Sequence, residues 1–185
     1  MKRLLLLSVV ILAFLSTMGF SCLVDNAVVS LDLVFSACYS INPGQNPAYG
    51  GSTTVSPDSL LGEFKDKVKS ARPFDIRVHV TGAFAGNVTG GVARINNIPI
   101  LTYSGAWSDF ATPQSLLGSS PHITPQSAGI AELVRVLLQP TPRPSVVLSS
   151  TGTLTGGGVP PVPAGLGVCV EVFAQADAEA VGSSD

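Results

Sequence analysis

The sequence predicts a mainly β protein, an antiparallel β-sandwich or barrel-like domain that carries one or two short helices. About six segments alternate apolar and polar residues in the manner of half-buried strands, and Gly, Pro and Asn cluster between these segments. The regular strand-helix-strand alternation of parallel α/β folds is missing from the pattern. Of the 185 residues, 45% are apolar and 12% are charged, which excludes a chain kept disordered by its charge.

The N-terminus predicts export. A basic start at residues 1–3 precedes an apolar run over residues 4–18, which is the layout of a secretory signal peptide and is too short to span a membrane. We therefore expect residues 1–21 to be a signal peptide and residues 22–185 to form a single β-rich extracytoplasmic domain.

The end of this leader allows two interpretations of Cys22. Gly19 and Ser21 are small residues at the positions that ordinary signal peptidase needs for a cut before Cys22. The leader also resembles that of bacterial lipoproteins, in which a cysteine just after the apolar run becomes the lipidated first residue. This resemblance covers residues 1–22 only, and it implies that Cys22 anchors the protein to a membrane.

The three cysteines predict one disulfide. If Cys22 carries lipid, Cys38 and Cys169 remain as a pair in an oxidising compartment. The alternative is a free buried cysteine at each of these two positions. The disulfide further requires that the first and last strands be neighbours.

The first half of the domain predicts a strand, a loop, a helix and a hairpin. Residues 27–41 alternate cleanly, and residues 42–57 are rich in Gly, Pro, Asn and Ser. Ser56 and Pro57 then start a helix over residues 57–71, which Pro73 ends. The strands expected at 74–81 and 88–95 form a hairpin with Gly86-Asn87 at its turn.

The second half predicts further strands and one ambiguous segment. Residues 125–138 fit either a helix or a strand, and we favour the helix because apolar residues recur at helical spacing. The other elements are a turn at Asn96-Asn97, strands at 98–107, 145–155 and 167–176, loops at 112–127 and 156–167, and a frayed tail to residue 185.

Motifs for catalysis, metal binding or cofactor binding are lacking, so we predict no enzyme activity, no metal and no cofactor. The alternative that the sequence leaves open is a hydrolase whose site no motif marks. The two histidines are His79, in a polar row with Asp75 and Arg77 on one strand, and His122 in a loop. A solvated sheet face and an exposed loop explain them. Tyr103 and Trp107, with His79, are the candidate ligand contacts, although core packing explains the two aromatic residues better.

These features predict a non-catalytic exported protein of the cell envelope, lipid-anchored, that acts as a structural or interaction module. Its expected partners are the membrane, further copies of itself or another envelope protein, because a sparsely charged surface leaves strand edges without the lysines that block pairing. Lys and Arg together number 10 against 12 Asp and Glu, which argues against nucleic acid. The alternative is an extracellular ligand-binding module, with carbohydrate as one ligand class.

Overall fold

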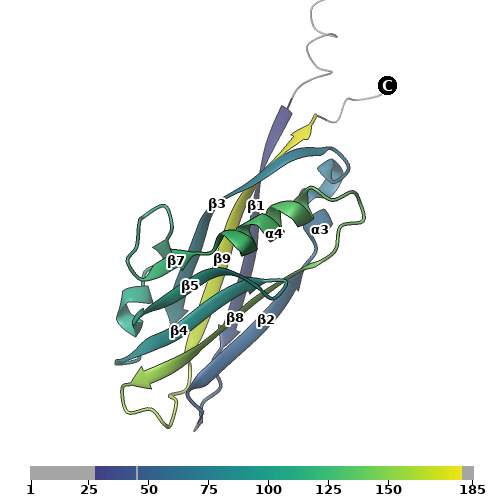
Figure 1. Cartoon of the computed structure of the whole chain (residues 1–185). Coiled ribbons are helices and arrows are strands. Elements are labelled where there is room, and N and C mark those ends of the chain that lie inside the picture. The colour runs from purple at the N-terminus through teal and green to yellow at the C-terminus, as the bar shows by residue number, and fades with distance from the viewer. Residues whose placement is uncertain (1–27, 45, 181–185) are drawn as a thin grey trace, which may run out of the picture.

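The computed structural model describes residues 28–44 and 46–180 and confirms the predicted antiparallel β-sandwich with two short α-helices (Figure 1). One sheet has the strand order β1-β9-β3-β6, and the other has the order β2-β8-β4-β5-β7. The predicted signal peptide and Cys22 lie outside the described residues. The strands are β1 (Val28–Ser40), β2 (Ala48–Val55), β3 (Val68–Thr81), β4 (Gly86–Ile95), β5 (Ile98–Ala106), β6 (Gln114–Ser115), β7 (Ile123–Pro125), β8 (Val146–Gly156) and β9 (Gly167–Glu179).

The core lies between the two sheets and is built by the alternation that the sequence displays. On β9, Val168, Val170 and Val172 are fully buried, whereas the residues between them face the other side of the sheet. The helices are α3 (Pro57–Leu61) and α4 (Ser127–Leu137), with 3₁₀ turns at η1 (Gly62–Phe64) and η2 (Trp107–Phe110).

Helix α4 closes one side of the sandwich and settles the ambiguous segment 125–138 as a helix. It packs against β3 of one sheet and β5 of the other (Figure 1), and it buries Leu133 and Leu137. Gly129 permits this close approach, because a side chain there would overlap the backbone of Pro99.

Strand β2 lies within residues 42–57, so the prediction of a continuous loop there was wrong. One of its two glycines makes room for an aromatic ring, which a sequence pattern does not reveal. A side chain at Gly51 would overlap the ring of Tyr39 on β1. Strand β4 has a similar glycine, because a side chain at Gly91 would overlap the ring of Tyr103 on β5.

The predicted helix over 57–71 was wrong beyond its first two turns. Residues from Val68 onward belong to β3 instead, where Val68 pairs with Ala178 and Ala71 with Ala176 of β9. Val68 and Ala71 pack against the core from the strand. Strand pairing therefore replaces the helical face that the spacing of apolar residues suggested.

The predicted hairpin around Gly86-Asn87 was also wrong, because β3 and β4 belong to different sheets. Residues 82–85 cross from one sheet to the other. The true hairpin joins β4 to β5, and Asn96 and Asn97 have positive φ angles of 49° and 68° at its turn. Two residues in this conformation form the tight turn that matches the twist of paired strands.

Two smaller differences concern chain segments expected to be irregular. The predicted loop 112–127 contains the short edge strands β6 and β7. Strand β9 continues to Glu179, beyond the predicted end at residue 176, because Val28 at the start of β1 pairs with Glu179.

Candidate functional site

A disulfide joins Cys38 of β1 to Cys169 of β9, which confirms the predicted pair. The two residues are opposite each other in the antiparallel register, with their Cα atoms 4.0 Å apart. Cys38 is exposed whereas Cys169 is 5% exposed, so solvent reaches the bond from the Cys38 side. A disulfide is typical of an oxidising, extracytoplasmic compartment.

His79 of β3 lies beside this disulfide, because β3 is the other neighbour of β9 and His79 pairs with Cys169. The two sulfur atoms and a ring nitrogen of His79 all lie within 4.8 Å of one another. The Nδ1 atom of His79 is buried and has no hydrogen-bond partner among the described residues. We call Cys38, His79 and Cys169 the Cys-His cluster. Sequence reasoning paired Cys38 with Cys169 and singled out His79 separately. It could not place His79 beside the pair, because strand order is not visible in the sequence.

The predicted polar row of Asp75, Arg77 and His79 does not form one solvated face. Asp75, Arg77 and His79 share one face, because they pair in regular register with Phe173, Glu171 and Cys169. The segment that contains Ser115 and Leu117 covers Asp75 on that face, and Asp75 is 1% exposed. Its carboxylate accepts hydrogen bonds of 2.7 Å from both Arg77 Nε and Ser115 Oγ. Burial alone would raise the pKa of Asp75, but these donors outweigh burial and the pKa lies below its ordinary value. Asp75 therefore holds β6 against β3.

Tyr103 and Trp107 lie in the core, at 3% and 2% exposure, as the core-packing interpretation expects. The indole nitrogen of Trp107 donates a 2.9 Å hydrogen bond to the carbonyl of Gly82, and the edge of Phe84 packs against its ring system. Neither aromatic residue therefore presents a ring face to solvent for a sugar to stack on.

His122, in the loop between β6 and β7, lies close to the carboxylate of Asp109 in η2. Its Nδ1 lies 3.5 Å from Asp109 Oδ2, and the same oxygen accepts a 2.9 Å hydrogen bond from the backbone N–H of Ala106. The His122 ring also packs edge-on against Phe110. These contacts hold the loop onto η2.

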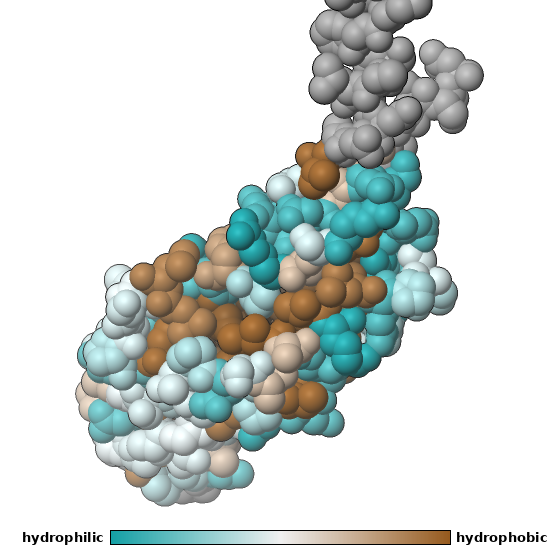
Figure 2. Space-filling model, turned by 45° about the horizontal axis from the view of Figure 1, so that its top comes forward, coloured by the Kyte–Doolittle hydropathy of each residue, from teal (hydrophilic) through white to brown (hydrophobic). Residues whose placement is uncertain are grey.

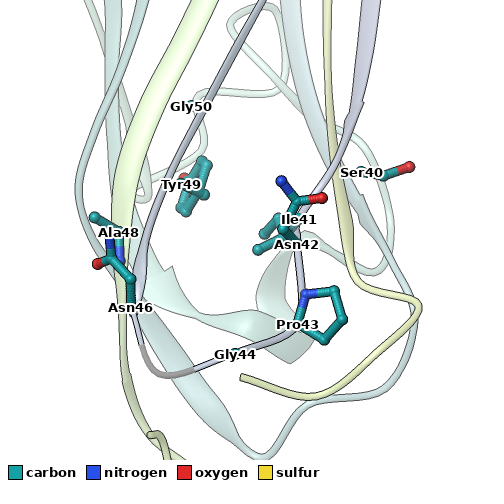
Figure 3. Close-up of a pocket in the computed structure, with 9 residues that line it drawn as sticks. All are labelled: Ser40, Ile41, Asn42, Pro43, Gly44, Asn46, Ala48, Tyr49 and Gly50. Carbon is teal, nitrogen blue, oxygen red and sulfur yellow. The ribbon is translucent and has the colours of Figure 1, made fainter. Parts of the chain in front are cut away.

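A pocket of about 410 Å³ lies at the end of the sandwich where β1 connects to β2. Figure 3 shows Asn42 and Pro43 on one side of the pocket, Asn46 and Ala48 on the other, and the Tyr49 ring between them. These residues fall in the segment predicted to be a loop, and no motif in the sequence marks them.

The three long loops do not gather around this pocket. Gly44 forms an isolated bridge with Val162, which brings the β1–β2 and β8–β9 connections together at this end. Figure 1 shows the segment between β6 and β7 at the side of the sandwich, away from them.

Hydrophobic side chains form a band across the side of the molecule that carries α4 (Figure 2). Along the helix, Ile130 and Val134 are partly buried and Leu138 is 46% exposed, at intervals of four residues. This spacing places the three side chains on one helical face. None of the helices in the described ranges is long and apolar enough to cross a membrane.

Comparison with known proteins identifies no family for this chain. No family model matches the sequence, and no curated protein matches it significantly. Among solved structures, the one entitled Desmodium yellow mottle tymovirus has a TM-score of 0.35 and 10% identity, covering 86% of this chain and 92% of that chain. A family 35 carbohydrate-binding module from Clostridium thermocellum has a TM-score of 0.29 and 7% identity, covering 80% and 97%. These TM-scores and identities are too low to indicate a function for this chain.

Proposed function

We propose that this chain is a non-catalytic, exported module of the cell envelope, anchored by lipid at Cys22, that pairs with a second copy of itself through the free edge of β1. The observation that carries the proposal is the position of β1. This strand of 13 residues is at the end of its sheet and pairs only with β9 within the described ranges.

The residues of β1 make its edge open to pairing. Asp32 is the single charged residue of the strand, which contains no lysine and no proline. Charged side chains and prolines are the usual means by which proteins block an edge. Val34 in the middle of the strand is 41% exposed.

The disulfide indicates which backbone groups face the free edge. The 4.0 Å separation of the Cα atoms of Cys38 and Cys169 is typical of an antiparallel pair that exchanges no backbone hydrogen bonds. The N–H and C=O groups of Cys38, and of residues of the same parity such as Val34 and Ser36, therefore point away from β9. They are available to a further strand.

A second copy fits this edge without repulsion. If two β1 strands pair antiparallel about a two-fold axis at Val34, Asp32 of one copy lies opposite Ser36 of the other. Like charges therefore do not meet, and each copy uses the same surface, as a closed two-fold dimer requires. The exposed Val34 side chains pack together at the axis.

Export and lipid anchoring would favour this pairing. The disulfide supports an oxidising compartment, and only five residues separate Cys22 from Val28 at the start of β1. So short a tether would hold the Val28 end of β1 of every copy near the same membrane surface. Two antiparallel β1 strands reach that surface with both anchors when they lie along it. Confinement of this kind raises the effective concentration of the partner strand.

A proline at position 34 tests the proposal. Val34→Pro removes an N–H from the free edge and leaves the hydrogen bonds to β9 in place, since edge strands tolerate proline. In analytical ultracentrifugation of the exported protein in mild detergent, we expect wild type and the matched control Val34→Ala to sediment as dimers, and Val34→Pro as a monomer. A monomeric wild type would overturn the proposal. Loss of the dimer in Leu138→Asp, with Val34→Pro still dimeric, would instead assign assembly to the hydrophobic band.

Ligand binding at the β1–β2 pocket is the second candidate function. The amide groups of Asn42 and Asn46 and the ring of Tyr49 offer the mixture of hydrogen-bonding and apolar contact that neutral ligands such as sugars use. Calorimetric titration with a panel of neutral oligosaccharides tests it. Binding that is lost in Asn42→Ala would support this function, and no heat with any of the sugars would count against it.

A further inference from the structure

We propose that reduction of the Cys38–Cys169 disulfide converts the Cys-His cluster into a binding site for a thiophilic divalent metal ion such as Zn²⁺. In this account the oxidised protein does not bind the ion, and the reduced protein binds one ion per chain. The site is additional to the strand edge and the pocket described above.

The three side chains have the chemistry and the proximity of a zinc site. Two cysteine thiolates and one imidazole form a recognised ligand set for Zn²⁺, in which a water molecule occupies the fourth position. Their donor atoms already lie within 4.8 Å of one another. Each is held on its own strand of one continuous sheet, because β9 lies between β1 and β3.

The unsatisfied nitrogen of His79 is the second observation that points to a ligand. Buried polar atoms almost always have a hydrogen-bond partner, so an orphan requires an explanation. The buried Nδ1 of His79 has none within the described ranges while the two sulfurs are bonded to each other. A metal ion held jointly with the two thiolates would give this nitrogen a partner.

Solvent exposure provides a route for both the reductant and the ion. Cys38 is on the outer face of the sheet and is exposed, whereas Cys169 is covered. An external dithiol would attack the Cys38 sulfur through its thiolate and form a mixed disulfide, with the Cys169 thiolate as leaving group. The second thiol of the reductant would then release Cys38.

Electrons and protons are conserved in the exchange between the dithiol and the protein disulfide. The dithiol loses two electrons and two protons and becomes a disulfide, and Cys38 and Cys169 gain them and become two thiols. Binding of the metal ion then releases two protons from these thiols, because thiolates are the ligands. The disulfide form of the dithiol, acting as the two-electron oxidant, would reverse the exchange, re-form the Cys38–Cys169 bond and eject the ion.

Cobalt absorption tests the site directly. The full exported protein, oxidised or reduced with a phosphine, is titrated anaerobically with Co²⁺, and sulfur-to-cobalt charge-transfer absorption is measured in the near ultraviolet. We expect one Co²⁺ per reduced chain, displaced by Zn²⁺, and no band from the oxidised chain. A reduced and folded protein without this band would overturn the proposal.

Matched variants separate this site from other thiols and histidines. His79→Gln should weaken Co²⁺ binding by at least about 10-fold, the loss that follows removal even of an outer partner of a metal ligand. His122→Gln, which changes the other histidine, should bind as wild type does, and Cys22→Ser should keep the band. Equal affinity in His79→Gln and wild type would exclude His79 as a ligand and overturn the proposal.

Loss of folding on reduction gives a further readout. If reduction alone unfolds the sandwich, Zn²⁺ added to the reduced protein should restore its far-ultraviolet circular dichroism, whereas Mg²⁺ should not. Failure of Zn²⁺ to restore it would contradict a metal site in the folded protein.

Discussion

The hydroxyl oxygens of Tyr49 and Tyr103 lie 2.7 Å apart inside the core, on strands β2 and β5 of the five-stranded sheet. Tyr103 also lies 2.6 Å from the Oγ of Ser150 on β8. Ser150 is fully buried, so the three hydroxyls depend on one another for hydrogen bonds. The hydroxyl groups of Tyr49, Tyr103 and Ser150 therefore form a hydrogen-bonded chain within the apolar core.

Removal of the central hydroxyl should destabilise the protein. Tyr103→Phe leaves the hydroxyls of Tyr49 and Ser150 without their partner, and an unsatisfied buried polar group costs about 1 to 3 kcal/mol. Urea denaturation at neutral pH should show this loss in the free energy of unfolding. The triple variant Tyr49→Phe, Tyr103→Phe, Ser150→Ala removes every unsatisfied group, so it should be more stable than the single variant. Equal stability of Tyr103→Phe and wild type would show that the hydrogen-bonded chain contributes nothing.

All three tyrosines should resist ionisation in the folded protein. Burial raises the pKa of Tyr39 to about 12 and raises the pKa of Tyr49 and Tyr103 as well. Because the unfolded chain ionises near pH 10, the unfolded state loses protons first, and stability falls as the pH rises from about 10 toward 12. Phenolate absorption should therefore appear together with the loss of circular dichroism. A phenolate signal near pH 10 in a fully folded protein would contradict this burial.

An ion pair between Asp58 and Arg143 links α3 to the segment before β8. The Arg143 side chain is 3% exposed, and its guanidinium lies 3.0 Å from Asp58 Oδ1. Asp58→Ala would leave a buried cation without its partner, and we expect a loss of about 3 kcal/mol in thermal or urea unfolding. Asp58→Asn keeps an oxygen acceptor and should lose less.

The same pair should give the protein acid sensitivity. Burial alone would raise the pKa of Asp58, but hydrogen bonds from the Arg143 backbone and side chain outweigh burial and lower it. A lowered pKa contributes stability above the unfolded value and loses it as the pH falls from about 4 through the folded value. This part of the acid-induced loss should disappear in Asp58→Asn, and an unchanged profile would exclude the pair as its source.

The disulfide should supply a large part of the stability. Cys38 and Cys169 are 131 residues apart in sequence, and closing a loop of that length is worth about 4 to 5 kcal/mol in the chain-entropy treatment. Denaturation of the double variant Cys38→Ser, Cys169→Ser should show this loss and should not respond to reductant. Free thiols at both positions in protein from its native compartment would contradict the bond.

The sequence predicted the elements that depend on residues close to one another in the chain. The alternation in β1 and β9, the Asn96-Asn97 turn and helix α4 each follow from the spacing of neighbouring residues. Strand β2 was missed because Gly50 and Gly51 look like loop residues, and only the ring of Tyr39 on a distant strand explains Gly51.

The candidate site depended on contacts that the sequence does not encode locally. The pairing of Cys38 with Cys169 followed from elimination among three cysteines. The position of His79 beside them required the strand order β1-β9-β3, which joins segments that are far apart in the chain. The burial of Asp75 likewise depends on a distant segment, because Ser115 and Leu117 cover its carboxylate.

Photocrosslinking at position 34 in intact envelopes tests the central claim, self-association through the free edge of β1, most directly. A benzophenone side chain replaces Val34, which is at the expected two-fold axis, and the control places it at Gln175 on β9, a central strand. The account predicts a covalent product of twice the monomer mass from position 34 and none from position 175. Monomer alone at position 34, or a product only with a different protein, would contradict pairing with a second copy.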